Sequence, residues 1–317
     1  MIYRPFVLVL LVLVSTNACN EPQNKETENI AAIEEADRPT PPLATEPGEE
    51  APTVTPIDNL PLGSYVGSFE AIEFDDEQNA MLRNKITLFV DSISAGYAAG
   101  RSVVAGNSRP WKGTAEFRNN LWHVIGEEPG DDRYDGVFEF DVDPTTKKVA
   151  GQWLANNKKL PVSVRAYELE KREFYYDPNR QLDEYILSSP FYGTYQTVME
   201  KYHDEETGKT YEYESEQAEA VTEAATKLNA STQKLTTSDV ENLYRGDLEV
   251  IRNTIFARHG YSFKNRKMRY FFDQMVDWYM PVSTDIRSEL TELELANIDL
   301  LKRYEEHSER YYDAFGR

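Results

Sequence analysis

The stretch that begins at Gly63 is the part of the sequence that most limits the possible folds. Up to about residue 170, short runs of aromatic and β-branched residues alternate with turn signals such as Gly106-Asn107, which tolerate turn dihedral angles. The predicted strands cover residues 64–74, 85–93, 95–104, 114–117, 121–125, 136–142, 148–155 and 162–169. About eight sequential strands at this spacing predict an antiparallel barrel or meander, and closure of the sheet would protect its edges.

The interior of such a barrel is open to two interpretations. The pairs Gly63 with Tyr65, in the first strand, and Gly151 with Trp153, late in the domain, resemble the glycine–aromatic motif of lipocalin-like barrels. A small barrel is either filled by side chains or holds one small ligand. The aromatic residues therefore indicate either structural packing or a cavity for a small apolar ligand.

The N-terminus carries an export signal. Arg4 is the only charge in residues 1–18, and Phe6 to Val14 is an unbroken apolar run, which suits the hydrophobic region of a secretory signal. Ala18 followed by Cys19 resembles a bacterial lipoprotein signal peptide, in which the cysteine after the cut is lipidated. The resemblance implies lipidation of Cys19 and a location in the bacterial cell envelope, at the periplasmic or surface face of the outer membrane. The alternative is an ordinary secretory signal that is cut near Ala18.

Residues 19–60 read as an acidic, proline-rich tether. Between residues 20 and 60, ten acidic residues face only Lys25 and Arg38, and seven prolines occur. Low hydrophobicity, like charge and proline favour an extended chain without a core. The segment is therefore predicted to be disordered and to hold the following domains away from a membrane.

The charge and the residue counts exclude several classes of protein. The net charge of −21 argues against nucleic-acid binding, which needs a net basic face. A single cysteine and four histidines leave little material for disulfides or a metal site, and no cofactor is expected. The acidic pairs Glu127-Glu128 and Asp131-Asp132 match no calcium-loop spacing, so we expect a solvated acidic loop there.

The remaining boundaries follow from changes in pattern. The barrel-like domain is predicted to cover residues 61–190, and residues 191–235 to hold a hairpin and a connector helix over 215–229. Residues 236–317 are predicted to form a small all-α module, so the whole chain is an α+β protein of several domains. In this module Asp247–Tyr261 has helical spacing, with Gly260 where a left-handed C-cap is needed. Thr291 and Glu294 form a candidate capping box for the last helix.

The C-terminal module resembles the bacterial YARHG domain over residues 236–306. The resemblance rests on ordered elements of the sequence, namely Arg252-Asn253, Ile255, Ala257-Arg258-His259-Gly260-Tyr261, Phe263, Trp278-Tyr279, Pro281, Leu290, Glu294, Asn297 and Tyr304-Glu305. Phe256 stands where the family has its first tyrosine, so that hydroxyl is lost. The resemblance implies an exported bacterial protein with a C-terminal module, and it brings no established activity. The structural motif residues are Asn253, Gly260, Trp278, Tyr279, Glu294 and Asn297; Trp278 and Tyr279 fit a core position.

One stretch of this module reverses the charge of the chain. No acidic residue lies between Val250 and Phe272, whereas six basic residues do: Arg252, Arg258, Lys264, Arg266, Lys267 and Arg269. Together with His259 they suit an anion-binding or partner-binding patch. The alternative is internal pairing, in which Arg252 or Arg258 binds a carboxylate such as that of Glu294, because the planar guanidinium suits bidentate pairing.

These features favour binding over catalysis. The sequence contains no Gly-x-Ser-x-Gly, His-Glu-x-x-His or phosphate-binding glycine loop, so no catalytic residue is predicted. The leading hypothesis is a non-enzymatic, lipid-anchored envelope protein that acts as a binding or scaffold module for an anionic envelope glycan or a protein partner. The second is a lipocalin-like carrier of a small apolar ligand, and the third a hydrolase of envelope polymers with paired carboxylates. Exposed Arg258 and His259 would favour the first hypothesis, and an apolar cavity in residues 61–170 the second.

Overall fold

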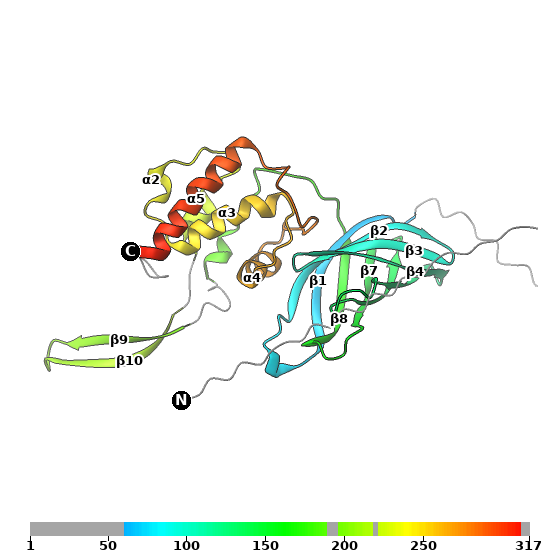
Figure 1. Cartoon of the computed structure of the whole chain (residues 1–317), viewed down its shortest axis with the longest axis horizontal. Coiled ribbons are helices and arrows are strands. Elements are labelled where there is room, and N and C mark those ends of the chain that lie inside the picture. The colour runs from blue at the N-terminus through cyan, green and yellow to red at the C-terminus, as the bar shows by residue number, and fades with distance from the viewer. Residues whose placement is uncertain (1–59, 189–195, 218–220, 312–317) are drawn as a thin grey trace, which may run out of the picture. The chain divides into compact units, whose positions relative to one another are not determined.

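A computed structural model of the chain describes residues 60–188, 196–217 and 221–311 (Figure 1). The predicted signal peptide, Cys19 and the acidic tether lie outside these residues. Among the described residues, no helix has both the length and the apolar character needed to cross a membrane.

The N-terminal part is a closed antiparallel barrel, as the strand pattern predicts. Its eight strands follow one another around the barrel, and β1 closes it by pairing with β8. The strands are β1 (Gly63–Phe74), β2 (Arg83–Ser94), β3 (Tyr97–Val104), β4 (Asn107–Arg118), β5 (Leu121–Glu127), β6 (Gly136–Asp143), β7 (Lys148–Ala155) and β8 (Val162–Lys171). A short 3-10 helix, η1 (Asp76–Gln78), lies between β1 and β2. β4 begins at Asn107, earlier than the predicted start at residue 114. This earlier part of the strand contains Pro110, which pairs with Arg101 of β3.

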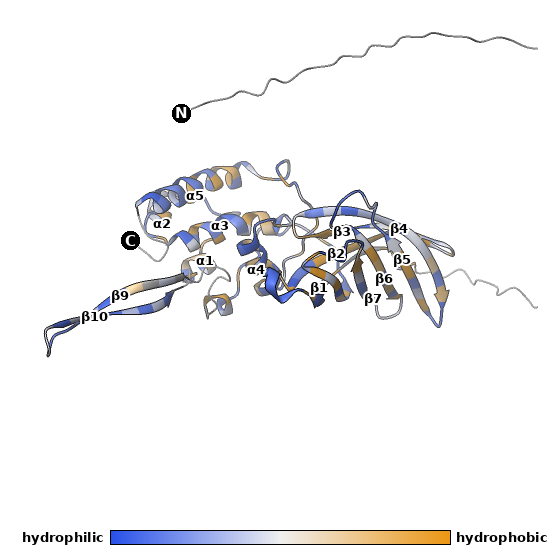
Figure 2. Cartoon of the chain, turned by 60° about the horizontal axis from the view of Figure 1, so that its bottom comes forward, coloured by the Kyte–Doolittle hydropathy of each residue, from blue (hydrophilic) through white to orange (hydrophobic). Residues whose placement is uncertain are grey.

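Alternation along the strands places the apolar side chains inside the barrel. Figure 2 shows polar and apolar residues alternating along these strands. Aromatic rings fill much of the interior: Trp111 packs edge-on against Phe140 with ring centroids 5.5 Å apart. Gly100 makes room for this packing, because a Cβ there would lie 1.9 Å from the Phe89 carbonyl oxygen and 2.7 Å from the Trp111 ring.

The middle of the chain contains a two-stranded hairpin and a short helix. β9 (Gln196–Asp204) and β10 (Lys209–Gln217) pair around the turn at the predicted hairpin, with Tyr202 opposite Tyr211. The predicted connector helix over 215–229 is wrong in extent. β10 continues to Gln217, and helix α1 covers only Glu223–Lys227, because Thr222 caps its start and Leu228 is extended.

The C-terminal part is a small helical module with its own core. Its elements after α1 are α2 (Thr237–Val240), α3 (Arg245–Arg258), α4 (Arg266–Met275) and α5 (Glu292–Tyr311). α3 ends where Gly260 adopts the left-handed φ of 72° that its position predicts. Tyr279 is fully buried in the core, and its hydroxyl donates to the Tyr261 carbonyl at 2.7 Å.

The boundary between the two parts differs from the predicted one at residue 190. The barrel ends with β8 at Lys171, and Leu182 and Ile186 pack in the helical core, the latter in the 3-10 helix η2 (Glu184–Ser188). Residues 56–317 form one compact unit, in which α4 contacts β2. Lys85 of β2 donates to the Val276 carbonyl at 2.8 Å, so a polar contact joins the barrel to the helical module.

Candidate ligand-binding site at the mouth of the barrel

A cavity of about 480 Å³ lies at one end of the barrel. Its lining includes residues of the β1–β2, β3–β4, β5–β6 and β7–β8 connections, which all lie at the same end of an antiparallel up-and-down barrel. It also includes two residues of α4. The lining residues used below are Phe69, Asn79, Ala80, Met81, Asn84, Arg109, Glu128, Phe138, Trp153, Leu160, Arg165, Arg266 and Arg269. The size falls within the range of small-molecule sites, roughly 300–1,000 Å³.

The inner side of this cavity is apolar and aromatic. Phe69, Phe138, Trp153 and Leu160 are all buried members of the barrel core. The rings of Phe69 and Trp153 meet edge-on, with centroids 6.1 Å apart. The barrel interior is therefore packed with side chains, and the cavity lies at its end. Each of the two interpretations, structural packing and a cavity, describes one part of the barrel.

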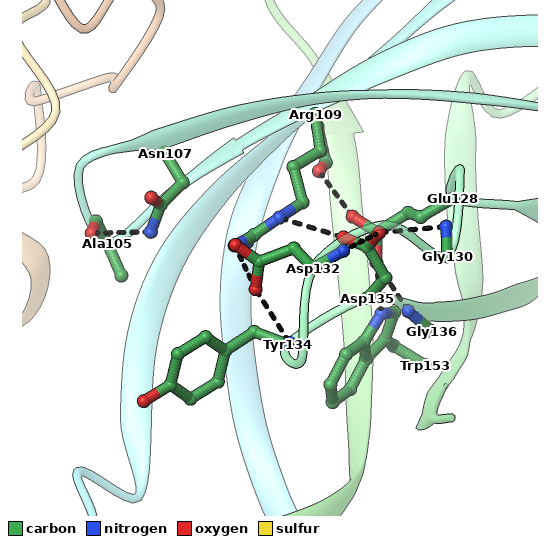
Figure 3. A network of polar contacts seen from close by, with 11 residues as sticks. Ala105, Asn107, Arg109, Glu128, Gly130, Asp132, Tyr134, Asp135, Gly136 and Trp153 are labelled. Carbon is green, nitrogen blue, oxygen red and sulfur yellow. Dashed lines mark hydrogen bonds and ion pairs between the residues drawn. The ribbon is translucent and has the colours of Figure 1, made fainter. Parts of the chain in front are cut away.

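Glu128 supplies a buried carboxylate at the cavity wall (Figure 3). Its Oε2 accepts the Trp153 indole N–H at 3.0 Å and the Gly136 backbone N–H at 2.8 Å. Burial raises the pKa of Glu128 above its usual range, although these hydrogen bonds act in the opposite direction. The prediction of a solvated acidic loop is wrong for this residue, which is 7% exposed. The buried positions of β5 alternate with a period of two, at Trp122, Val124 and Gly126, and Glu128 is the next position in this series. This period was the sequence signal that Glu128 is buried.

Arg109 and Asp135 hold the neighbouring β5–β6 loop in place (Figure 3). Arg109 Nε lies 3.1 Å from Asp135 Oδ1, and its NH2 lies 3.5 Å from Asp132. Asp135 is almost fully buried and also accepts the backbone N–H groups of Gly130 and Asp132, at 2.9 and 3.1 Å. The charge of Arg109 is therefore balanced within the loop.

Arg165 approaches the cavity from β8 and is held by backbone carbonyls. Its NH1 donates to the carbonyls of Phe69 and Leu82, each at 3.1 Å, and its NH2 to that of Met81 at 2.8 Å. Burial, followed by repulsion from the Arg269 guanidinium, lowers the pKa of Arg165 to about 10. The side chain is therefore still charged at neutral pH.

Two cations of the helical module complete the lining. Arg266 donates to the Asn79 carbonyl at 2.6 Å and to the Asn79 side-chain oxygen at 3.0 Å. Arg269 lies one turn further along α4, and its Nε is buried without a hydrogen-bond partner in the described part of the chain. Sequence reasoning placed both in an anion-binding stretch but missed Arg165 and the barrel face that they meet.

The other predicted patch residues lie outside the lining of this cavity, and three of them have partners of their own. Arg252 forms a bidentate pair with Glu305 at 2.6 and 2.9 Å, and Lys267 pairs with Glu249. Arg258 is buried, and its Nε donates to the Arg180 carbonyl at 2.8 Å. Lys264 is exposed. The six predicted cations therefore do not form one surface, because internal pairing occupies several of them.

His259 and Glu294 are also used inside the module. Glu294 accepts His259 Nε2, the Tyr176 hydroxyl and the Thr291 backbone N–H, each at 3.0 Å. The Tyr176 ring stacks on His259 with centroids 4.2 Å apart. Burial by itself raises the pKa of Glu294, but the hydrogen bonds from His259, Thr291 and Ser231 outweigh it and lower this pKa to about 2.

The remaining motif residues bind backbone groups. Asn297 accepts the Leu235 N–H at 3.0 Å and donates to the carbonyls of Ala230 and Gln233, both at 2.8 Å. Asn253 donates to the Glu249 carbonyl at 2.8 Å within α3. The half-buried Trp278 donates to the Gln181 carbonyl at 2.7 Å. Across the described residues, no group of three His, Cys, Asp or Glu side chains is arranged to hold a metal ion.

Comparison with known proteins identifies the helical module. Neither the curated proteins nor the solved structures gave a match to this chain. The model of the YARHG domain family matches residues 223–306, which extends the predicted region of resemblance toward the N-terminus to include α1. The chain therefore carries a C-terminal YARHG domain, preceded by a closed eight-stranded antiparallel barrel.

Proposed function

We propose that this chain is a non-enzymatic binding protein of the bacterial cell envelope, and that the mouth of its barrel holds one small amphipathic molecule. The observation that carries the proposal is the composition of the cavity, in which an aromatic inner side faces a wall with several guanidinium groups. A site of this kind offers apolar burial to one end of a ligand and polar contacts to the other. Arg258 and His259 are buried and bonded internally, which argues against an anionic glycan bound through them.

A cavity-filling substitution tests this proposal. Ala80 lines the cavity from the loop between η1 and β2, where it is half-buried outside any strand. Ala80→Trp is expected to weaken the binding of decanoate, measured by calorimetry on the full chain, at least about tenfold, because the indole occupies the space of the alkyl chain; each excluded methylene forfeits about 0.8 kcal/mol.

The matched control is Ala95→Trp. Ala95 lies in the exposed β2–β3 turn, which is at the other end of an up-and-down barrel. This variant should bind decanoate like the parent chain. Equal binding by all three proteins, or none by any, would exclude the barrel mouth as the site for such a molecule.

The proposed location rests on Cys19, which we propose is the site of lipid attachment. A chain with several acyl groups is held stably at a membrane, whereas one acyl group gives only marginal binding. Cys19→Ala should lose incorporation of labelled palmitate and move from the membrane fraction to the soluble fraction of cells. Retention of the label in this variant would contradict the assignment.

A second candidate function, an envelope scaffold for a protein partner, is favoured by the β9–β10 hairpin. Tyr202, Tyr211 and Tyr213 are each about half exposed, at 58%, 48% and 47%. Exposed tyrosines supply contact area at interfaces with little loss of side-chain entropy. The two functions are compatible, because the hairpin contributes nothing to the lining of the cavity.

A further inference from the structure

The charges that line the cavity are unbalanced. Four arginines, Arg109, Arg165, Arg266 and Arg269, face one carboxylate, that of Glu128. Arg109 is already paired with Asp135 and Asp132. Glu128 Oε2 is already engaged by the N–H groups of Trp153 and Gly136. The remaining arginines of the lining are Arg165 of β8 and Arg266 and Arg269 of α4.

The contacts of Arg165 fix its position without neutralising it. The side chain is 9% exposed, and its hydrogen bonds go to three backbone carbonyls, from Phe69, Leu82 and Met81. Carbonyl groups orient a guanidinium plane but carry no net charge to offset it. A buried cation without a counter-ion is costly, and an anion that enters beside it recovers part of that cost.

Arg269 of α4 also lacks a full complement of partners. Its Nε has no acceptor among the described residues, and the carboxylate that acts on it belongs to Asp273 of the same helix. Burial raises the pKa of Asp273 to about 7, so this group is only partly ionised at neutral pH, and it also faces Lys85. Repulsion from Arg269 contributes to the lowered pKa of Arg165, and repulsion from Arg266 to that of Arg269. Arg269 thus lies beside two other guanidinium groups in the lining of the cavity.

Asn84 adds a neutral polar group to the same wall. Its side chain is 4% exposed, and its Oδ1 is buried without a hydrogen-bond partner in the described residues. A buried acceptor left unpaired is costly, so a ligand group that donates to it would recover that cost.

We infer that the ligand of the barrel carries an anionic head group, a carboxylate or phosphate, which binds between Arg165 of β8 and Arg269 of α4. The inference rests on the proposed function and names the chemistry of its ligand. Guanidinium groups suit carboxylate and phosphate because the planar fork can donate two parallel hydrogen bonds. Because one arginine comes from the barrel and the other from the YARHG domain, the bound anion also links the two domains.

Matched ligands with one alkyl chain test the head group. The full chain is titrated with decanoate, decyl phosphate, decanol and inorganic phosphate at neutral pH and low salt. We expect both alkyl anions to bind at least about tenfold more tightly than decanol, which corresponds to about 1.4 kcal/mol. This preference should shrink when the ionic strength is raised from about 0.02 M to about 0.3 M, because salt screens the attraction.

The variants then locate the anion. Arg269→Gln should remove most of the preference for anions and leave the affinity for decanol unchanged. Arg269→Lys, which keeps the charge, should retain part of the preference. The control Arg118→Gln removes an exposed cation next to the β4–β5 turn, at the other end of the barrel, and should change nothing. Melting temperatures of the variants show whether each is folded.

The outcomes separate the two proposals. If decanol binds as tightly as the anions and Ala80→Trp abolishes both, the cavity is a binding site but the anion inference is overturned. A preference for anions that survives in Arg269→Gln also overturns it. If inorganic phosphate binds as tightly as decyl phosphate, the anion-binding inference is supported, but the proposal that the ligand is amphipathic is contradicted. The absence of any binding contradicts the proposed function itself.

Discussion

Glu294→Ala is expected to lower the free energy of unfolding of the YARHG domain by about 3–5 kcal/mol, because it leaves several buried polar groups without their hydrogen-bond partner, at about 1–3 kcal/mol each. Glu294 is fully buried at the start of α5 and accepts hydrogen bonds from His259, Tyr176 and Thr291. The alanine variant leaves the His259 ring and the Tyr176 hydroxyl without an acceptor, and it removes half of the capping box. Amide hydrogen exchange of α3 and α5 in the full chain measures the change.

The control for this prediction is Glu292→Ala. Glu292 is exposed and is the first residue of α5. Like Glu294 it interacts with the helix dipole, but it does not belong to the buried network, so its loss should lower the free energy of unfolding by at most about 1 kcal/mol. Similar exchange rates for the two variants would show that the buried network contributes little to the stability of the domain.

The pH dependence of stability gives a second readout of the same residue. The pKa of Glu294 is about 2 in the folded chain, below the unfolded value of about 4.3. Stabilisation by this carboxylate is therefore complete above about pH 4.5 and is lost as the pH falls through about 2, a total of roughly 3 kcal/mol. Glu294→Gln should lack this component, so the difference between the two stability profiles should narrow on acidification. A constant difference would contradict the assigned ionisation.

Asn297→Ala is the second substitution with a large expected effect, a loss of about 3 kcal/mol in the free energy of unfolding. The Asn297 amide is almost fully buried and bonds three backbone groups of the 230–235 segment, those of Leu235, Ala230 and Gln233. Alanine cannot replace any of these bonds, and two of the three partners, Ala230 and Leu235, are buried. In this variant, the amides of the segment that joins α1 to α2 should exchange faster than in the parent chain, and the increase should be larger there than in α4.

Asp299→Ala is the matched control for Asn297. Asp299 lies on the exposed side of α5, where substitutions usually change stability by about 0.5 kcal/mol or less. Unchanged protection of residues 230–235 in the Asn297 variant would show that the amide is not needed to hold this segment.

The predictable parts of the structure are those governed by local chemistry. Runs of aromatic and β-branched residues separated by turn signals predicted the barrel, and on each of its strands successive side chains face opposite sides. The same rule applied to Trp122, Val124 and Gly126 points to a buried Glu128, which the density of neighbouring acids concealed. The end of α3 followed from Gly260, since few other residues adopt its positive φ.

The parts that were not predictable depend on residues far apart in the chain. Arg258 binds the carbonyl of Arg180, and Glu294 binds the hydroxyl of Tyr176, partners separated by 78 and 118 residues. No local pattern marks Arg165 as a cavity residue, because its significance comes from Arg269, which lies on an element of the other domain. The basic stretch between Val250 and Phe272 is continuous in sequence, but internal pairing engages some of its cations and not others.

By itself, the sequence determined the strands of the barrel, the caps of the helices and the YARHG resemblance, because these depend on the spacing of neighbouring residues. Only the tertiary structure decided which cations are paired and which meet at the barrel mouth. The physical reason is that the state of a charged side chain depends on burial and on the charges around it, and folding brings those from distant parts of the chain. Arg252 and Arg269 are alike in sequence context, yet the first is paired with Glu305 and the second borders the cavity.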